Sequence, residues 1–266
     1  MDIIKIKELN FKYDKELVFE SLNLNIKSGS FTSIIGPSNS GKSTLANILA
    51  GLYRYNGSIE IDSDKLNKQN KRKIRRKMGI ILSDTSFVAE TVMDEIVFTL
   101  ENLKIKRSNI NKKVEQISNL LGINNILNKN PQDLNSEEKQ LVRVASALIH
   151  EPKILILDEA FTCIDPSKKE IVLNLLKDLN KKYKVTIINI TNDMEEVLLG
   201  EEVVLLEKGK VILQGNKKKV LEHEKVFTRL KLELPFIVKL SKSLMYYELL
   251  DNVSYDTKEM VDALWK

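Results

Sequence analysis

A glycine-bearing loop carries the most specific chemistry in this sequence. Residues 36–43 read Gly-Pro-Ser-Asn-Ser-Gly-Lys-Ser, which matches the pattern of a phosphate-binding loop. Glycines let the backbone curl so that its N–H groups face phosphate oxygens, and a following helix adds the positive end of its dipole. We expect Lys42 to bridge the β- and γ-phosphates of a nucleoside triphosphate, and Ser43 to give its hydroxyl to Mg²⁺.

Two adjacent carboxylates, Asp158 and Glu159, follow the apolar run Ile154–Leu157. Four consecutive apolar residues predict a strand in a sheet interior, whose C-terminal end presents both acids. An apolar run that ends in Asp-Glu is common and usually marks only the end of a strand. Combined with the loop, it predicts that Asp158 holds Mg²⁺ through water and that Glu159 polarises an attacking water.

The elements around these residues alternate between strand and helix. Phe31–Ile35 is an apolar, β-branched run before the loop, and Thr44–Leu52 has apolar residues at helical spacing after it. This alternation predicts an α/β fold with a mainly parallel sheet. Further strands are predicted at Ile3–Phe11, Leu22–Ile26, Gly57–Ile61, Met78–Leu82, Lys153–Leu157, Val185–Ile190 and Val203–Leu206.

Helical patterns fill much of the remaining chain. From Thr91 to Leu148 the apolar residues recur at helical spacing, and Ile171–Leu179 is amphipathic. Gly209 predicts a hairpin turn, and the tail after about Lys225 is again helical. We therefore expect a main domain over residues 1–224, with a helical insertion at about 84–150, and a helical appendage over 225–266.

Composition restricts the function. The chain of 266 residues is 42% hydrophobic and 30% charged, which is ordinary for a folded protein. No apolar run reaches a membrane-spanning length and the N-terminal residues lack a secretory pattern, so we expect a cytosolic chain unless a partner holds it at a membrane.

One cysteine, Cys163, excludes an internal disulfide. The net charge of +5 is mild, and the Lys-rich stretches Lys68–Lys77 and Lys217–Lys219 are interpreted as solvated faces rather than surfaces for acidic lipid or nucleic acid.

These motifs together resemble the ATP-binding subunits of ABC transporters over nearly the whole chain. Pro131–Gln140 lies where that family has its signature motif, and Thr162–Asp165 lies at the D-loop, whose aspartate normally crosses to a partner subunit. The resemblance implies a P-loop NTPase fold with an antiparallel β subdomain. It implies an adenine-stacking role for Tyr13, and ATP contacts from Tyr13, Gly36, Pro37, Ser38, Asn39, Ser40, Gly41, Lys42, Ser43 and Thr44.

Two stretches narrow the resemblance to the energy-coupling factor ATPases. These are residues 87–102, which follow the expected glutamine loop, and Leu232–Leu240 near the C-terminus. The second implies pairing of two ATPases through the appendage. Further implications are a second, non-identical ATPase, a transmembrane coupling subunit and a substrate-binding membrane protein for vitamins or metal ions. The chain would then lie peripherally on the cytoplasmic face of the membrane and couple ATP hydrolysis to import.

Three positions depart from the family pattern. Ser83 replaces the glutamine that reaches Mg²⁺ or the attacking water, in a loop that looks two residues short. Asn135-Ser136-Glu137 replaces Ser-Gly-Gly, and the Glu137 carboxylate would repel a partner's γ-phosphate. Asn192 replaces the switch histidine and can hydrogen-bond a phosphate without carrying charge. Glu159 and Asn192 are therefore the candidate catalytic residues of a slow ATPase.

Other functions remain open from the sequence. The chain could serve another ABC importer or exporter, or it could be a catalytically degenerate subunit that binds ATP to regulate its partner. A soluble ABC protein acting on nucleic acid would usually carry two such cassettes or a long coiled-coil insertion, and this sequence has neither. No nucleic-acid partner is expected, and the transported substrate cannot be read from an ATPase.

Overall fold

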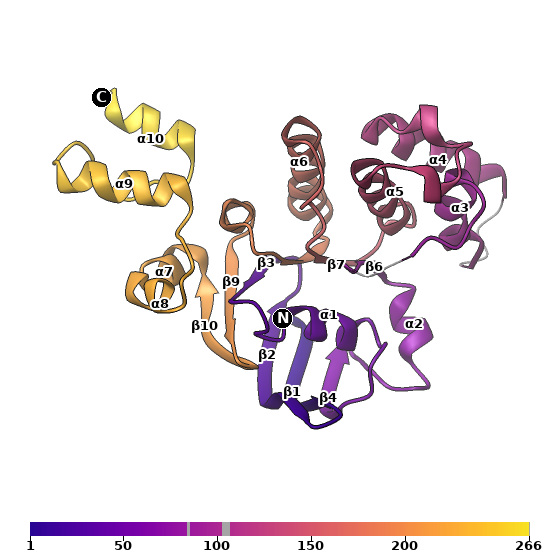
Figure 1. The fold of residues 1–266 in the computed structure, drawn as a ribbon, viewed down its shortest axis with the longest axis horizontal. Coiled ribbons are helices and arrows are strands. Elements are labelled where there is room, and N and C mark those ends of the chain that lie inside the picture. Colours follow the sequence, from indigo (N-terminus) through magenta and orange to yellow (C-terminus); the bar gives the residue numbers. More distant parts are fainter. Residues whose placement is uncertain (84–85, 103–106, 266) are drawn as a thin grey trace.

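The computed structural model describes residues 1–83, 86–102 and 107–265. It contains a six-stranded and a four-stranded sheet, with helical groups at the two ends of the larger sheet (Figure 1). This architecture confirms the predicted α/β class with a mainly parallel core sheet, an antiparallel β subdomain, a helical insertion and a C-terminal helical appendage. Among the described helices, none is both long and apolar enough to cross a membrane.

The six-stranded sheet has the order β10-β9-β3-β8-β7-β6, with every neighbouring pair parallel except the β9–β10 hairpin. Its strands are β3 (Phe31–Ile35), β6 (Met78–Ile81), β7 (Ile154–Asp158), β8 (Thr186–Ile190), β9 (Glu202–Glu207) and β10 (Lys210–Asn216). All five residues of β3, β7 and β8 are buried, because both faces of this sheet are covered. The apolar runs in the sequence reflect this burial.

Successive side chains of each central strand enter different cores. In β7, Ile154 and Ile156 join the core that includes α1 (Lys42–Leu49) and the antiparallel sheet. Leu155 and Leu157 join the core on the other face, which includes the helical insertion. Because side chains alternate between the two faces of a strand, the same strand packs against one layer on each face of the sheet.

The four-stranded sheet is antiparallel and has the order β2-β1-β4-β5. Its strands are β1 (Asp2–Tyr13), β2 (Glu16–Lys27), β4 (Asn56–Ile61) and β5 (Asp64–Lys65). Alternate residues of β1, among them Ile4 and Ile6, are buried in the same core as Leu45 and Ile48 of α1. This sheet therefore covers the helix that follows the glycine-bearing loop.

The helical insertion packs beside β6, at one end of the sheet in Figure 1. Its predicted apolar stripe is present, since Val92, Ile96 and Leu100 are buried. Helix α6 lies next to it, over the same face of the sheet. These helices are α3 (Val92–Asn102), α4 (Arg107–Leu121), α5 (Ser136–Leu148) and α6 (Pro166–Tyr183), with 3₁₀ turns η1 (Asn124–Ile126) and η2 (Pro131–Asp133), while α2 (Lys71–Arg75) precedes β6.

The C-terminal helices lie at the opposite end of the sheet, beside β9 and β10 (Figure 1). They share a core with Val203 and Leu205 of β9, so the appendage is packed on the main domain. The first turn of α8 contains the expected boundary at residue 224, and this division into domains stays a prediction. The C-terminal helices are α7 (Lys217–Leu221), α8 (Glu224–Arg229), α9 (Phe236–Tyr246) and α10 (Thr257–Leu264). The 3₁₀ turn η3 (Met194–Leu199), between β8 and β9, contributes Val197 to the same core.

Several element bounds differ from those expected. The helix expected at Thr44–Leu52 is α1, which begins at Lys42 because Gly41 adopts a left-handed conformation (φ 101°) that starts the helix. It ends at Leu49, before Gly51 with φ 68°. Strand β2 begins at Glu16 rather than Leu22, since exposed residues in its first half hide the alternation. The expected insertion begins at residues 84–85, which lie outside the described part.

Candidate functional site

The glycine-bearing loop joins β3 to α1, and its tight packing explains both glycines. A Cβ on Gly36 would lie 2.1 Å from the Leu206 carbonyl oxygen, and one on Gly41 would lie 2.8 Å from the Phe19 ring. No other residue type fits without displacing these neighbours. The N–H of Gly209 donates to the Ser40 carbonyl oxygen at 3.0 Å, so the β9–β10 turn supports the loop from behind.

Lys42 holds the loop closed around its own side chain. Its ammonium donates to the carbonyl oxygens of Gly36 at 2.7 Å and Pro37 at 3.0 Å. Burial lowers the pKa of Lys42, although the nearby Glu159 carboxylate favours its charged form. The Ser40 hydroxyl is buried and has no hydrogen-bond partner among the described residues. A phosphate in the loop would supply acceptors to both groups.

Ser43 and Asp158 meet across the edge of the sheet. The Ser43 hydroxyl donates to Asp158 Oδ1 at 3.1 Å, which joins the first turn of α1 to the end of β7. Serine hydroxyl and carboxylate oxygens are hard ligands that Mg²⁺ accepts, usually together with waters and substrate phosphates. The pair therefore fits a magnesium ion, which would neutralise charge on the β- and γ-phosphates.

Glu159 follows directly and adopts a left-handed backbone conformation with φ 52°. Its N–H donates to the Ile190 carbonyl oxygen at 3.0 Å, which ties the turn after β7 to β8. Burial raises the pKa of Glu159, and repulsion from Asp158 adds to the rise, while the Lys42 ammonium and the backbone N–H of Asn192 oppose it. A carboxylate whose pKa is raised toward neutrality is better suited to accept a proton from water.

Tyr13 lies at the end of β1, with 41% of its surface exposed. Its hydroxyl is 3.3 Å from the Thr44 hydroxyl, which places it beside the first turn of α1. The ring is held edge-on by Phe11 and Tyr53, at centroid distances of 4.9 and 5.6 Å. No local sequence pattern links Tyr53 to a residue forty positions earlier, so its contact with Tyr13 could not be predicted. Tyr13 is therefore partly exposed beside the loop, where the family resemblance expects the adenine ring.

The segment after β8 carries the expected switch position and a buried ion pair. Asn192 is exposed, and its neighbour Asp193 accepts a hydrogen bond from Lys169 of α6 at 2.8 Å. The same ammonium lies 2.6 Å from Glu196, which is buried and also accepts from the Asn189 amide at 3.0 Å. Lys169 therefore fixes the segment that carries Asn192 to α6.

Glu137 is folded back onto its own chain. One carboxylate oxygen accepts from the Asp165 backbone N–H at 3.0 Å and the other from Lys168 at 2.8 Å. Hydrogen bonding to Lys168, with a smaller effect of the Asp165 N–H, lowers the pKa of Glu137. Its charge is therefore compensated by α6, which the sequence did not suggest. Asn135 and Glu138 form a reciprocal cap at the start of α5.

Lys42, Ser43, Asp158 and Glu159 thus lie together at the carboxyl ends of the parallel strands. Ser38 and Asn39 form the exposed top of the loop. Ser83 is exposed in the turn after β6, next to residues 84–85, which are outside the described ranges. A strand, a glycine-bearing loop and a helix with this lysine and acidic pair define a nucleotide-binding protein of the P-loop class.

Comparison with known proteins narrows this class. The family model described as "ABC transporter" matches residues 19–162. The energy-coupling factor transporter ATP-binding protein EcfA1 of Mycoplasma mobile is 36% identical, over 99% of this chain and 97% of that protein. EcfA1 of Ligilactobacillus salivarius is 35% identical, over 99% of this chain and 95% of that protein. The chain belongs to the ABC transporter family, among its energy-coupling factor transporter ATP-binding proteins.

Solved structures agree with this assignment. CbiO1 of Clostridium perfringens, described as part of an ABC transporter complex, superposes with a TM-score of 0.72 at 31% identity, over 91% of this chain and 99% of that chain. A dimeric ATP-binding cassette in a post-hydrolysis state with ADP and Pi gives a TM-score of 0.74 at 28% identity. That match covers 80% of this chain and 98% of the cassette. The family couples ATP hydrolysis to transport together with transmembrane subunits.

Proposed function

We propose that this chain is the ATP-binding, energy-coupling subunit of a membrane import complex for vitamins or metal ions. The observation that carries the proposal is the loop around Lys42, which lies beside Asp158 and Glu159 at one edge of the parallel sheet. The similarity to energy-coupling factor ATP-binding proteins over nearly the whole chain supports the transport role. In this role the chain lies peripherally on the cytoplasmic face of the membrane, held there by its partners.

Each residue of the site then has a separate task. Tyr13 stacks on adenine, and residues 36–44 surround the phosphates, with Lys42 as their main positive charge. Ser43 and Asp158 would hold Mg²⁺, and Ser83, which is exposed after β6, would contribute to the same metal site. Glu159 positions and deprotonates the attacking water, and Asn192 hydrogen-bonds the γ-phosphate.

A groove between the sheet and the helical insertion is our proposed docking surface for the transmembrane coupling subunit. It has a volume of about 310 Å³ and is lined by residues of β6, α3 and α5 and by the segment at Ser86–Phe87. Glu95 accepts the N–H groups of Val88 and Ala89, both at 3.0 Å, and the Arg143 guanidinium lies 5.3 Å from the Phe87 ring centroid. A partner that moves Phe87 would therefore move the insertion.

The partner ATPase is proposed to be non-identical. A complete ATP site in this family uses the loop of one subunit and the signature motif of the other. In this chain Asn135, Ser136 and Glu137 stand where glycines would permit close approach of phosphate. A second subunit with an intact signature would complete the site built on Lys42.

Replacing Lys42 by alanine tests the nucleotide assignment. We expect Lys42→Ala to abolish measurable Mg-ATP affinity without unfolding the chain, because it removes the main charge that faces the phosphates. Isothermal titration calorimetry gives the affinity, and thermal unfolding gives the fold. The exposed Lys181→Ala is a charge-matched control that should retain affinity. Equal affinity in Lys42→Ala and the control would exclude this loop as the site.

A second candidate function is regulatory ATP binding without turnover. It is favoured by Ser83 and Asn192, which replace two side chains that position water and phosphate in the family. Single-turnover hydrolysis in the assembled complex, with the catalytic glutamate of the partner ATPase replaced by glutamine, separates the two functions. Product formation that is lost in Glu159→Gln identifies an ATPase, whereas bound but uncleaved ATP identifies a regulatory subunit.

A further inference from the structure

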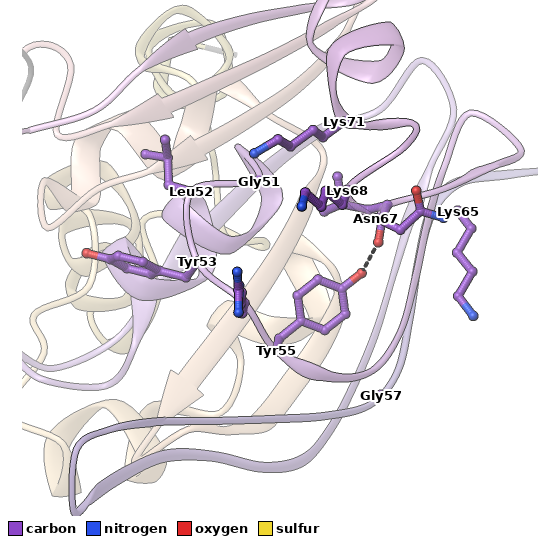
Figure 2. A pocket seen from close by; sticks show the side chains of 11 residues that line it. Gly51, Leu52, Tyr53, Tyr55, Gly57, Lys65, Asn67, Lys68 and Lys71 are labelled. Carbon is purple, nitrogen blue, oxygen red and sulfur yellow. Dashed lines mark hydrogen bonds between the residues drawn. The ribbon is translucent and has the colours of Figure 1, made fainter.

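A second cavity lies at the antiparallel sheet, away from the glycine-bearing loop. It has a volume of about 500 Å³, within the size range of small-molecule sites. Two connections form its walls, one between α1 and β4 and the other between β5 and α2 (Figure 2). Its lining residues are Gly51, Leu52, Tyr53, Arg54, Tyr55, Gly57, Lys65, Leu66, Asn67, Lys68 and Lys71.

The lining carries four cationic side chains and no carboxylate. Arg54, Lys65, Lys68 and Lys71 form no ion pair with any described residue. In contrast, Lys73, on the same short helix as Lys71, pairs with Asp64 at 2.6 Å. The positive charge of the cavity is therefore uncompensated, while the charge next to it is neutralised.

Contacts between the two connections position the walls of the cavity. The Tyr55 hydroxyl donates to the Leu66 carbonyl oxygen at 2.5 Å and joins the two connections across the cavity floor. Gly51, with φ 68°, turns the chain at the end of α1 and lies next to the stem of Lys71. In Figure 2 the ammonium groups of Lys68 and Lys71 point toward the side formed by Tyr53 and Tyr55, whereas that of Lys65 points away.

We propose that this cavity is a second anion site, which binds a phosphate-bearing ligand independently of the ATP loop. Lys68 and Lys71 from one side and Arg54 from the other supply ammonium and guanidinium groups, which suit the several oxygens of a polyphosphate. Lipid headgroups carry the same phosphate chemistry, but a concave site whose wall includes Tyr53 and Tyr55 favours a free ligand. None of residues 36–44 lines the cavity, so the ATP site and the anion site are separate.

The site would also contact the adenine end of the ATP site. Tyr53 lines the cavity and forms one ring cluster with Tyr13, which it meets at an interplanar angle of 85°, and with Phe11, which is stacked on it at 5.4 Å. A ligand against Tyr53 would thus lie one side chain from the ring that stacks on adenine.

Tripolyphosphate is the probe for this proposal, and Lys42→Ala is the background, because that variant lacks the main phosphate contact of the ATP loop. Calorimetry compares Lys42→Ala with the triple variant that adds Lys68→Ala and Lys71→Ala. The control triple variant adds Lys112→Ala and Lys181→Ala, which remove the same charge from exposed helix positions. We expect the cavity variant to lose at least about tenfold in affinity and the control less than about twofold.

Equal losses in the two triple variants, or no binding by Lys42→Ala, would overturn the proposal. Flotation with vesicles containing phosphatidylglycerol separates the two sources of phosphate. Vesicle binding that depends on Lys68 and Lys71, without tripolyphosphate binding, would show that the free-ligand assignment is wrong. Thermal unfolding of each variant confirms its fold, and Lys68→Ala alone, at an exposed position, provides a milder substitution for the same comparison.

Discussion

The environment of Glu159 suits a proton acceptor but destabilises the folded chain. It is partly buried, adjoins the Asp158 carboxylate and has a left-handed backbone. Each feature disfavours the ionised side chain or its backbone conformation, and such residues concentrate at active sites. Because burial and repulsion raise the pKa of Glu159, the ionised group is less favourable in the folded chain than in the unfolded chain.

The stability of Glu159→Gln should therefore depend on pH. A raised pKa in the folded state means that ionisation lowers the free energy of unfolding above both pKa values, and that this cost disappears below the ordinary value of 4.5. We expect Glu159→Gln without nucleotide to be more stable than the native chain at about pH 7, with the difference shrinking as the pH falls through the raised pKa.

Urea unfolding at several pH values measures this difference. The exposed Glu20→Gln is the control and should match the native chain at each pH. A Glu159→Gln variant that is less stable than the native chain near neutral pH would contradict the assignment of a disfavoured carboxylate.

Asn192 is the second residue-scale test. We expect Asn192→His to raise hydrolysis at the site of Lys42 and Glu159, because a histidine could stabilise charge on the γ-phosphoryl oxygens. The gain should be about tenfold, or roughly 1.4 kcal/mol, because Ser83 leaves the site incompletely organised. Adding Ser83→Gln should give more than the sum of the two effects. Single-turnover kinetics in the assembled complex are the measurement, and no gain from either change would favour the regulatory function.

At the scale of elements, α6 connects two parts of the site, the signature region and the segment after β8. At its N-terminus, the Asp165 N–H and the Lys168 ammonium both donate hydrogen bonds to Glu137 of the signature region. One residue further, Lys169 holds Asp193 and the buried Glu196 after β8. A displacement of α6 would therefore move the signature region and the segment of Asn192 together.

Two lysines of α6 provide a matched comparison. Lys169→Ala leaves Glu196 buried without its cation, and we expect a loss of about 2–3 kcal/mol in the free energy of unfolding, less than for a fully buried pair because Lys169 is partly exposed. Lys182 pairs with Asp178 on the solvent side of the same helix, so Lys182→Ala should cost less than about 0.5 kcal/mol. Urea unfolding measures both, and equal costs would contradict a structural role for the buried pair.

At the scale of the whole molecule, the C-terminal helices contact the segment that carries Asn192. The N–H of Phe236 at the start of α9 donates to Glu195 at 2.6 Å, three residues after Asn192. The same helices share a core with β9. Large apolar side chains remain exposed beyond this contact, among them Tyr246, Tyr247 and Trp265. These features support our proposal that the appendage contributes to pairing of two ATPases.

Pairing gives the prediction at this scale. We expect the purified chain to remain monomeric with Mg-ATP, because a homodimer would place two substituted signature motifs against the two γ-phosphates. Light scattering after gel filtration measures the mass, with Glu159→Gln used to prevent turnover. Replacing residues 135–137 by Ser-Gly-Gly should increase ATP-dependent self-association. A stable ATP-dependent homodimer of the native chain with fast turnover would exclude the need for a second ATPase.

The sequence alone predicted those features that depend on residues close together in the chain. The phosphate-binding loop, the acidic pair after β7 and the types of most elements depend on residues close together in the chain. Glycine at positions 36 and 41, and apolar periods of two or 3.6, therefore predicted them. The bounds of α1 and β2 were less accurate, since Gly41 and exposed strand residues control those ends.

Contacts between distant segments were decided only by the tertiary structure. Tyr53 reaches Tyr13, Lys168 compensates Glu137, and Lys169 pairs with the buried Glu196. None of these pairs has a spacing that a helix or strand period would reveal, because each joins two elements whose packing brings them together. The same reason applies to the proposed anion site, because Lys68 and Lys71, which the sequence indicates as part of a solvated face, line a cavity together with the distant connection at residues 51–55.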